Sequence, residues 1–144
     1  IFTFGLAGFA SLLLASMAGA TEARLQGTAA LAAKSLSEQL SMNPAALQRY
    51  LDPPEIVTAI CDGTMACTPD QQADYDLKLW QIELAGRIRN ARGLVCRDGT
   101  PQDGGDGDAQ CDGAGPLVIK IFWPGLRTGP DGRLRQHRIA MEVS

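Results

Sequence analysis

The sequence predicts an α+β fold in which a long N-terminal helix packs on a small antiparallel sheet, with a second helix beside it. Three observations predict this class. Residues 1–42 keep a helical pattern with no internal turn signal, and residues 69–90 repeat apolar side chains every three or four positions. Residues 117–143 contain two runs in which apolar and polar side chains alternate. A chain of 144 residues has room for one domain with a modest core.

The first part of the long helix is apolar. Residues 1–20 carry no charge, and a helix of about 20 residues spans the ~30 Å core of a bilayer. We therefore divide the chain into a hydrophobic half-helix for a membrane or a fibre core, residues 1–20, and a soluble head, residues 21–144. The head includes the amphipathic half of the helix. A secretory signal peptide is the alternative, because residues 18–20 resemble a cleavage site, but no basic region precedes the apolar run.

Small residues recur along this apolar helix at every fourth position. They are Ala7, Ser11, Ala15 and Gly19. Such a ridge lets helix backbones approach closely in an apolar medium. We interpret it as a helix-packing surface, and the alternative is the ordinary composition of a membrane helix.

The helix continues past the apolar run with a narrower apolar stripe. The stripe consists of Leu25, Ala29, Ala32, Leu36 and Leu40. A helix that is apolar along one side must lie against something, most simply a sheet. Asn43-Pro44 ends it, because proline disfavours helical geometry at the preceding residue. The predicted helix over residues 1–42 is about 60 Å long.

The second helix has a clear start signal. Thr68 is a capping residue, Pro69 suits the first helical position, and Gln71 completes a capping box. The apolar stripe that follows is Ala73, Leu77, Trp80, Leu84 and Ile88. We predict a helix over residues 69–90, with Trp80 in the core.

The four cysteines predict disulfides. Cys61, Cys67, Cys96 and Cys111 match no zinc-binding spacing, and an even set after an apolar segment is typical of an oxidising compartment. Two disulfides allow three pairings. The short loops favour Cys61–Cys67 and Cys96–Cys111, and the other pairings stay open.

An acidic, glycine-rich loop occupies residues 97–115. Its aspartates Asp103, Asp106, Asp108 and Asp112 are candidate calcium ligands, but their spacing does not match an EF-hand. The favoured interpretation is a solvated loop held by a disulfide, so no metal ligand and no cofactor is predicted.

The C-terminal part reads as a β-hairpin. Strands are predicted at 117–123 and 133–143, with a turn at 129–132. His137 reads as a surface residue, and no nucleophile or carboxylate pair accompanies it, so the sequence predicts no enzyme and no catalytic residue. The late arginines Arg127, Arg133, Arg135 and Arg138 read as a solvated strand face. The net charge of −3 argues against a nucleic-acid partner.

The order of these parts resembles the type IV pilins, and among them the minor pilins of the PilV type. The segments that carry the resemblance are Phe4 to Gly8 with the uncharged run after it, Glu22 to Gln26, Leu36 to Pro44, Cys67 to Pro69 with Tyr75, Asp76, Leu77 and Trp80, Arg92 to Asp98, and Cys111 to Gly113. Together they extend over nearly the whole chain. The family's processing site and assembly glutamate have no counterpart in this sequence.

The resemblance implies a structural subunit of a type IV pilus that takes part in assembly initiation and the tip complex. Its partners would be other minor pilins and the major pilin, through the N-terminal helix, and a large tip adhesin. It implies a single-pass anchor in the inner membrane with a periplasmic head, followed by a place in the extracellular fibre or at its tip. A type II secretion pseudopilin and a membrane-anchored periplasmic binding domain or enzyme are the alternatives.

Overall fold

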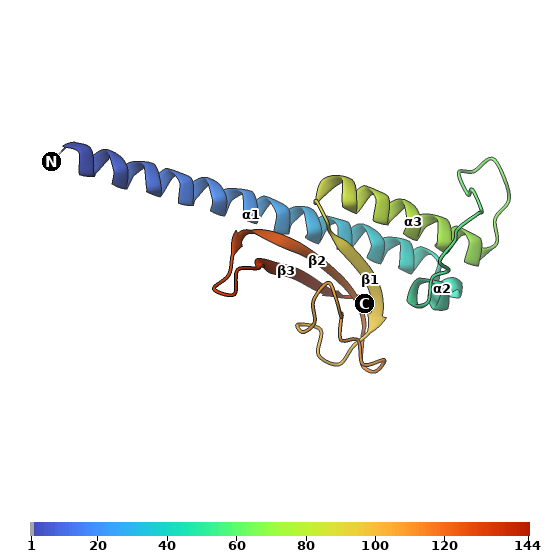
Figure 1. Ribbon diagram of the computed structural model, residues 1–144. Helices are drawn as coiled ribbons and strands as arrows, with labels where there is room; N and C mark the ends of the chain where they lie inside the picture. The colour runs from blue at the N-terminus through green and yellow to red at the C-terminus, as the bar shows by residue number, and fades with distance from the viewer. Residues whose placement is uncertain (1) are drawn as a thin grey trace.

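A computed structural model describes the backbone of residues 2–144 and the side chains of residues 8–144. Its elements are α1 (Phe2–Met42), a 3₁₀ turn η1 (Pro44–Ala46), α2 (Leu47–Leu51), α3 (Pro69–Arg87), β1 (Arg92–Arg97), β2 (Leu117–Thr128) and β3 (Leu134–Glu142). The α+β prediction, with a long N-terminal helix and a small antiparallel sheet, is confirmed. Figure 1 shows α1 projecting well beyond the rest of the molecule, with α3 and the sheet gathered around its second half.

The second half of α1 lies at the centre of the head. It packs against α3 on one side and against β2 and β3 on another. Ala29, Ala33 and Leu36 are fully buried and Leu40 nearly so. Alanines at the contact allow the neighbouring backbones to lie close. The predicted Leu25 and Ala32 are partly buried against this core, and Ala33, which lies outside the predicted stripe, is fully buried.

Helix α3 begins as the sequence predicts. The Thr68 side chain accepts from the Gln71 amide, and the Gln71 side chain accepts from the Thr68 amide. The helix ends at Arg87, three residues earlier than predicted, because Ile88 is extended and Asn90 takes a left-handed φ of 56°. This turn sends the chain directly into β1.

The sheet has the order β1-β2-β3, and both pairings are antiparallel. One face of β2 presents Ile119, Ile121 and Trp123 to the core. The other face presents Val118, Lys120 and Phe122, and all three are also fully buried. The cover on that second face is the segment between β1 and β2, residues 98–116, which we call the covering loop.

The predicted membrane anchor is wrong. Among the residues that the structure describes, no helix combines the length and the apolar character needed to cross a membrane. Gly, Ala and Ser separate the large apolar side chains in residues 8–20 of α1, and the charged Glu22 and Arg24 follow within about two turns of Met17. These residues lower the mean hydropathy of the described part of the helix.

Candidate functional site

The first described part of α1 is an exposed apolar helix. All side chains of residues 8–17 are exposed, although none of them is charged. The large ones are Phe9 at 63%, Leu12 at 70%, Leu13 at 48%, Leu14 at 69% and Met17 at 67% exposure. At 100° per residue these large side chains cover about 200° of the helix circumference, and small residues such as Ser11 and Ala15 occupy the rest. A contiguous apolar surface of this kind marks an interaction site.

The predicted helix-packing residues lie on this exposed segment. Ser11, Ala15 and Gly19 are exposed, while the side chain of Ala7 lies outside the described ones. The Ser11 hydroxyl donates to the Gly8 carbonyl at 2.8 Å, so its polar group is satisfied within the helix. A Cβ at Gly8 or Gly19 would meet nothing within 4 Å. The ridge is therefore open to a neighbour, and its packing role stays a prediction.

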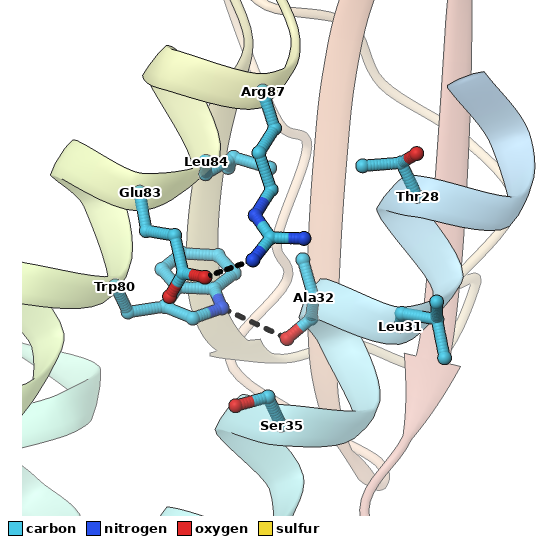
Figure 2. A pocket seen from close by; sticks show the side chains of 8 residues that line it. All are labelled: Thr28, Leu31, Ala32, Ser35, Trp80, Glu83, Leu84 and Arg87. Carbon is cyan, nitrogen blue, oxygen red and sulfur yellow. Dashed lines mark hydrogen bonds and ion pairs between the residues drawn. The ribbon is translucent and has the colours of Figure 1, made fainter. Parts of the chain in front are cut away.

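A groove of about 220 Å³ runs between α1 and α3 (Figure 2). At its base the Trp80 indole N–H donates to the Ala32 carbonyl at 2.8 Å. Glu83 and Arg87 pair at 2.6 Å along its rim. The Trp80 hydrogen bond joins α3 to α1, and the Glu83–Arg87 ion pair lies within α3. The groove is therefore part of the contact between the two helices, and these polar groups are already paired. Trp80 is 3% exposed, so its predicted place in the core is confirmed.

Both disulfides form between the cysteines that are near in sequence. Cys61 pairs with Cys67, and Cys96 pairs with Cys111. The favoured pairing is confirmed. The second disulfide joins β1 to the covering loop, so it holds the loop close to the sheet.

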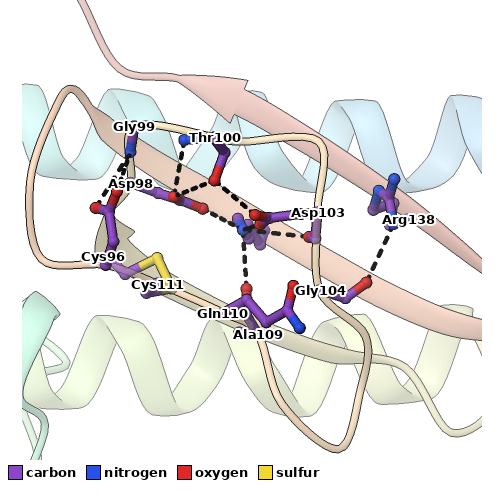
Figure 3. A network of polar contacts seen from close by, with 12 residues as sticks. Cys96, Asp98, Gly99, Thr100, Asp103, Gly104, Ala109, Gln110, Cys111 and Arg138 are labelled. Atoms are coloured by element: carbon purple, nitrogen blue, oxygen red, sulfur yellow. Dashed lines mark hydrogen bonds and ion pairs between the residues drawn. A yellow bond between two sulfur atoms is a disulfide. The ribbon is translucent and has the colours of Figure 1, made fainter.

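A buried lysine of β2 lies beneath the covering loop, and Figure 3 shows its loop partners Asp98, Asp103 and Ala109. Lys120 points out of β2, and its ammonium forms an ion pair with Asp98, which is also fully buried. The same nitrogen donates to the Asp103 carboxylate at 3.0 Å and to the Ala109 carbonyl at 2.8 Å. Oxygens from three points of the loop therefore converge on the Lys120 ammonium. These contacts hold the loop against the outer face of β2.

The ion pair favours its charged form. The hydrogen bond from Lys120 lowers the pKa of Asp98, and the Thr100 amide adds to that effect. Burial by itself lowers the pKa of Lys120, but the hydrogen bonds to Asp98 and Asp103 outweigh it and raise that pKa. Thr100, followed by Lys120, lowers the pKa of Asp103.

The candidate calcium ligands do not share one site. Asp103 contacts Lys120, Asp108 accepts from the Gln110 amide at 2.9 Å, and Asp112 accepts from the Ala114 amide at 2.8 Å. Within the described chain, the group of potential ligands that does converge is Cys96, Asp98 and Cys111, in which both sulfurs belong to a disulfide. The loop is held by its disulfide and is mostly exposed, as predicted, but Asp98 at its start is fully buried against Lys120.

His137 is not the free surface residue that the sequence suggests. Its Nδ1 lies 3.0 Å from a Glu22 carboxylate oxygen on α1, and its ring stacks on Trp123 at 5.8 Å. It is about three-quarters buried. All four late arginines, Arg127, Arg133, Arg135 and Arg138, are exposed as predicted. Arg138 in addition donates to the Gly104 carbonyl in the covering loop at 3.1 Å.

The pairing of Asp98 with Lys120 is a structural feature that the sequence pattern did not predict. The signal was a lysine between Val118 and Phe122 on one side of an otherwise apolar strand. A lysine at such a position indicates either an exposed face or a buried partner. The partner lies 22 residues earlier in the chain, beyond the reach of pattern reasoning.

No protein-family model matches this chain, and no curated protein or solved structure matches it either. The resemblance to the type IV pilins thus stays a prediction from the sequence.

Proposed function

We propose that this chain is a non-catalytic assembly subunit of the type IV pilus class, with the pilin-like fold that its helix and sheet suggest, and that it acts as a minor pilin in assembly initiation and the tip complex. One observation carries the proposal. An uncharged helical segment, residues 8–17, is exposed on all sides and is continuous with the helix that forms the centre of the head. Such a segment needs neighbours to bury it.

The free energy available from that burial is large. Phe9, Met17 and the three leucines at 12–14 would each contribute about 1.5–3 kcal/mol on full burial, or on the order of 10 kcal/mol together. The costs of association offset part of it. A bundle of like helices is the simplest partner, because it covers a helix from every direction. The partners we propose are other minor pilins and the major pilin, with a large tip adhesin beyond them.

The small-residue ridge supports the same role. Ser11, Ala15 and Gly19 leave the helix backbone accessible over two turns. Because α1 is one continuous helix from Phe2 to Met42, contacts made by its first half fix the position of the head. A subunit built in this way places its head at a set distance from the axis of the bundle.

The covering loop favours this function over that of a calcium-holding pseudopilin. Its converging oxygens meet the Lys120 ammonium, which already supplies a positive charge at that point. The oxygens that converge in this loop are thus already paired with a cation of the chain itself.

Deletion and complementation test the proposal. Deleting the gene in its source organism should abolish or strongly reduce surface pili, and the wild-type chain should restore them. Ala15→Leu should fail to restore them, because the added side chain separates packed helices. The matched control is Ala10→Leu, the same change about 140° around the helix from Ala15.

Two results would contradict the proposal. One is a normal number of pili after deletion. The other is equal restoration by Ala15→Leu and Ala10→Leu with equal amounts of each chain in the cell.

A further inference from the structure

A β-hairpin arm projects from one end of the head. The tip of the β2–β3 hairpin, residues 126–135, which we call the basic arm, is exposed over nearly all its length. It exposes Leu126 at 59% and Leu134 at 54%. Arg127, Arg133 and Arg135 lie beside these leucines, and Asp131 is the single acidic residue of the arm. Arginine next to exposed apolar side chains is a composition enriched at protein–protein contacts.

The basic arm has a defined conformation. Its turn is closed by the Gly129 amide donating to the Arg133 carbonyl at 2.7 Å. At its base the register shifts between Pro124 and Thr128, and a Cβ at Gly125 would lie 2.8 Å from the Arg135 carbonyl oxygen. Glycine is therefore required where the two strands come close. The contact of His137 with Glu22 then fixes the base of the arm against α1.

A second exposed segment lies at the opposite end of the head. Residues 52–67, between α2 and α3, form a loop that we call the acidic loop. It exposes Ile56 at 75%, Ile60 at 60% and Met65 at 70%. Its charged residues are Asp52, Glu55 and Asp62, all exposed, and it contains no lysine or arginine. The Cys61–Cys67 disulfide and a hydrogen bond from Lys78 to the Val57 carbonyl at 3.3 Å hold its shape.

The two segments face opposite directions along α1. Figure 1 shows the β2–β3 turn on the side from which the N-terminal half of α1 projects. The acidic loop lies past the other end of that helix, beside α2. The head is therefore basic and apolar at one end, and acidic and apolar at the other.

We propose that the basic arm of one copy docks on the acidic loop of a second copy, head to tail along the α1 direction. This inference rests on the proposed assembly function and adds the surface through which heads meet. A second copy fits because both complementary surfaces are on the same chain and at opposite ends. A head-to-tail contact of this kind is heterologous and extends into a line of subunits. Opposite charges at its rim set the orientation and make it sensitive to salt.

A crosslinking experiment tests the contact. A photoreactive phenylalanine analogue replaces Leu134 in the full chain, kept in a mild nonionic detergent that covers the apolar helix. Equal amounts of ¹⁴N- and ¹⁵N-labelled chain are mixed and irradiated. The expected product joins residue 134 of one copy to a peptide within 52–67 of another. Crosslinks confined to one copy, or directed to another region of the second copy, would overturn the proposal.

A charge exchange tests the electrostatics. The doubly substituted arm Arg133→Glu/Arg135→Glu and the doubly substituted loop Asp52→Arg/Glu55→Arg should each weaken self-association about tenfold or more. An equimolar mixture of the two variants should associate again, because each arm then meets a loop of opposite charge. The matched control is Arg89→Glu, an exposed arginine in the turn after α3, which should associate like the wild type. Sedimentation velocity at low and high salt measures the wild type, the two variants, their mixture and the control.

The results separate the two proposals. A mixture that fails to associate, together with crosslinks outside the acidic loop, overturns the head-to-tail contact while the effect of Ala15→Leu on pili still stands. Normal pili after deletion overturn the pilus function while the crosslink between copies still stands.

Discussion

At the scale of single residues, Lys120 is the position on which the covering loop depends most. It is fully buried on the outer face of β2, and its partners come from three separate points of the loop. A buried charge is tolerated only when its partners are in place, and removing one partner leaves the other charge uncompensated. The folded conformation of the loop and the buried ion pair therefore depend on each other.

Replacing this lysine should strongly destabilise the head. Lys120→Met keeps the length of the side chain but leaves Asp98 buried without its cation, and we expect the melting temperature to fall by about 10 °C or more. The control is Lys34→Met, because Lys34 pairs with Glu38 on an exposed surface, and such pairs contribute little. Thermal unfolding followed by circular dichroism measures both. Equal effects of the two substitutions would contradict a structural role for the buried pair.

At the scale of elements, the contact between β1 and α3 depends on a residue without a side chain. A Cβ on Gly93 would lie 2.2 Å and 2.6 Å from two ring atoms of Trp80. The ring cannot retreat easily, because its indole N–H is hydrogen-bonded to Ala32 of α1. Gly93 therefore lets the edge strand and the two helices come together around one tryptophan.

Two glycine-to-alanine substitutions should have opposite effects. Gly93→Ala should lower the free energy of unfolding by about 1–3 kcal/mol, because it overpacks the core. Gly86→Ala should raise it by about 0.5–1 kcal/mol, because Gly86 lies within α3 and its Cβ would meet nothing within 4 Å. Urea denaturation of both variants gives the two signs. A stabilising Gly93→Ala would show that Trp80 moves away without cost.

At the scale of the whole molecule, the stability of the head should depend on pH at both extremes. Asp98 and Asp103 have lowered pKa values in the folded protein, so they stabilise it above the usual aspartate pKa of 3.8. That contribution is lost as the pH falls through the lowered values. Burial raises the pKa of Tyr50 to about 12, and the pKa of Lys120 is also raised. Both groups therefore stabilise the head up to about pH 10, and their contributions decline above it.

Denaturation across the pH range checks this dependence. The free energy of unfolding should be nearly constant in the middle of the range, fall below about pH 4 and fall again above about pH 10. In the Lys120→Met variant the acid decline should be smaller, because Asp98 and Asp103 no longer gain from the ammonium. An unchanged acid decline in that variant would mean that other carboxylates cause it.

The features that the sequence determined by itself are local ones. The long helix, the Thr68–Gln71 capping box, the two short disulfide loops and the hairpin follow from periodicity, turn residues and spacing within a few residues. Each depends on interactions between near neighbours in the chain, and those are the interactions that a pattern records.

Only the tertiary structure decided which polar groups are buried and which apolar groups are not. It placed Lys120 against Asp98, moved His137 from the expected surface to a contact with Glu22, and put Trp80 under Ala32. It also left the apolar residues 8–17 exposed and set the basic arm and the acidic loop at opposite ends of the head. These outcomes depend on contacts between segments far apart in the chain, whose geometry is fixed only when the layers pack. The same sequence pattern is therefore compatible with a lysine on a solvated strand face or with a lysine buried beneath a covering loop, and packing selected the second.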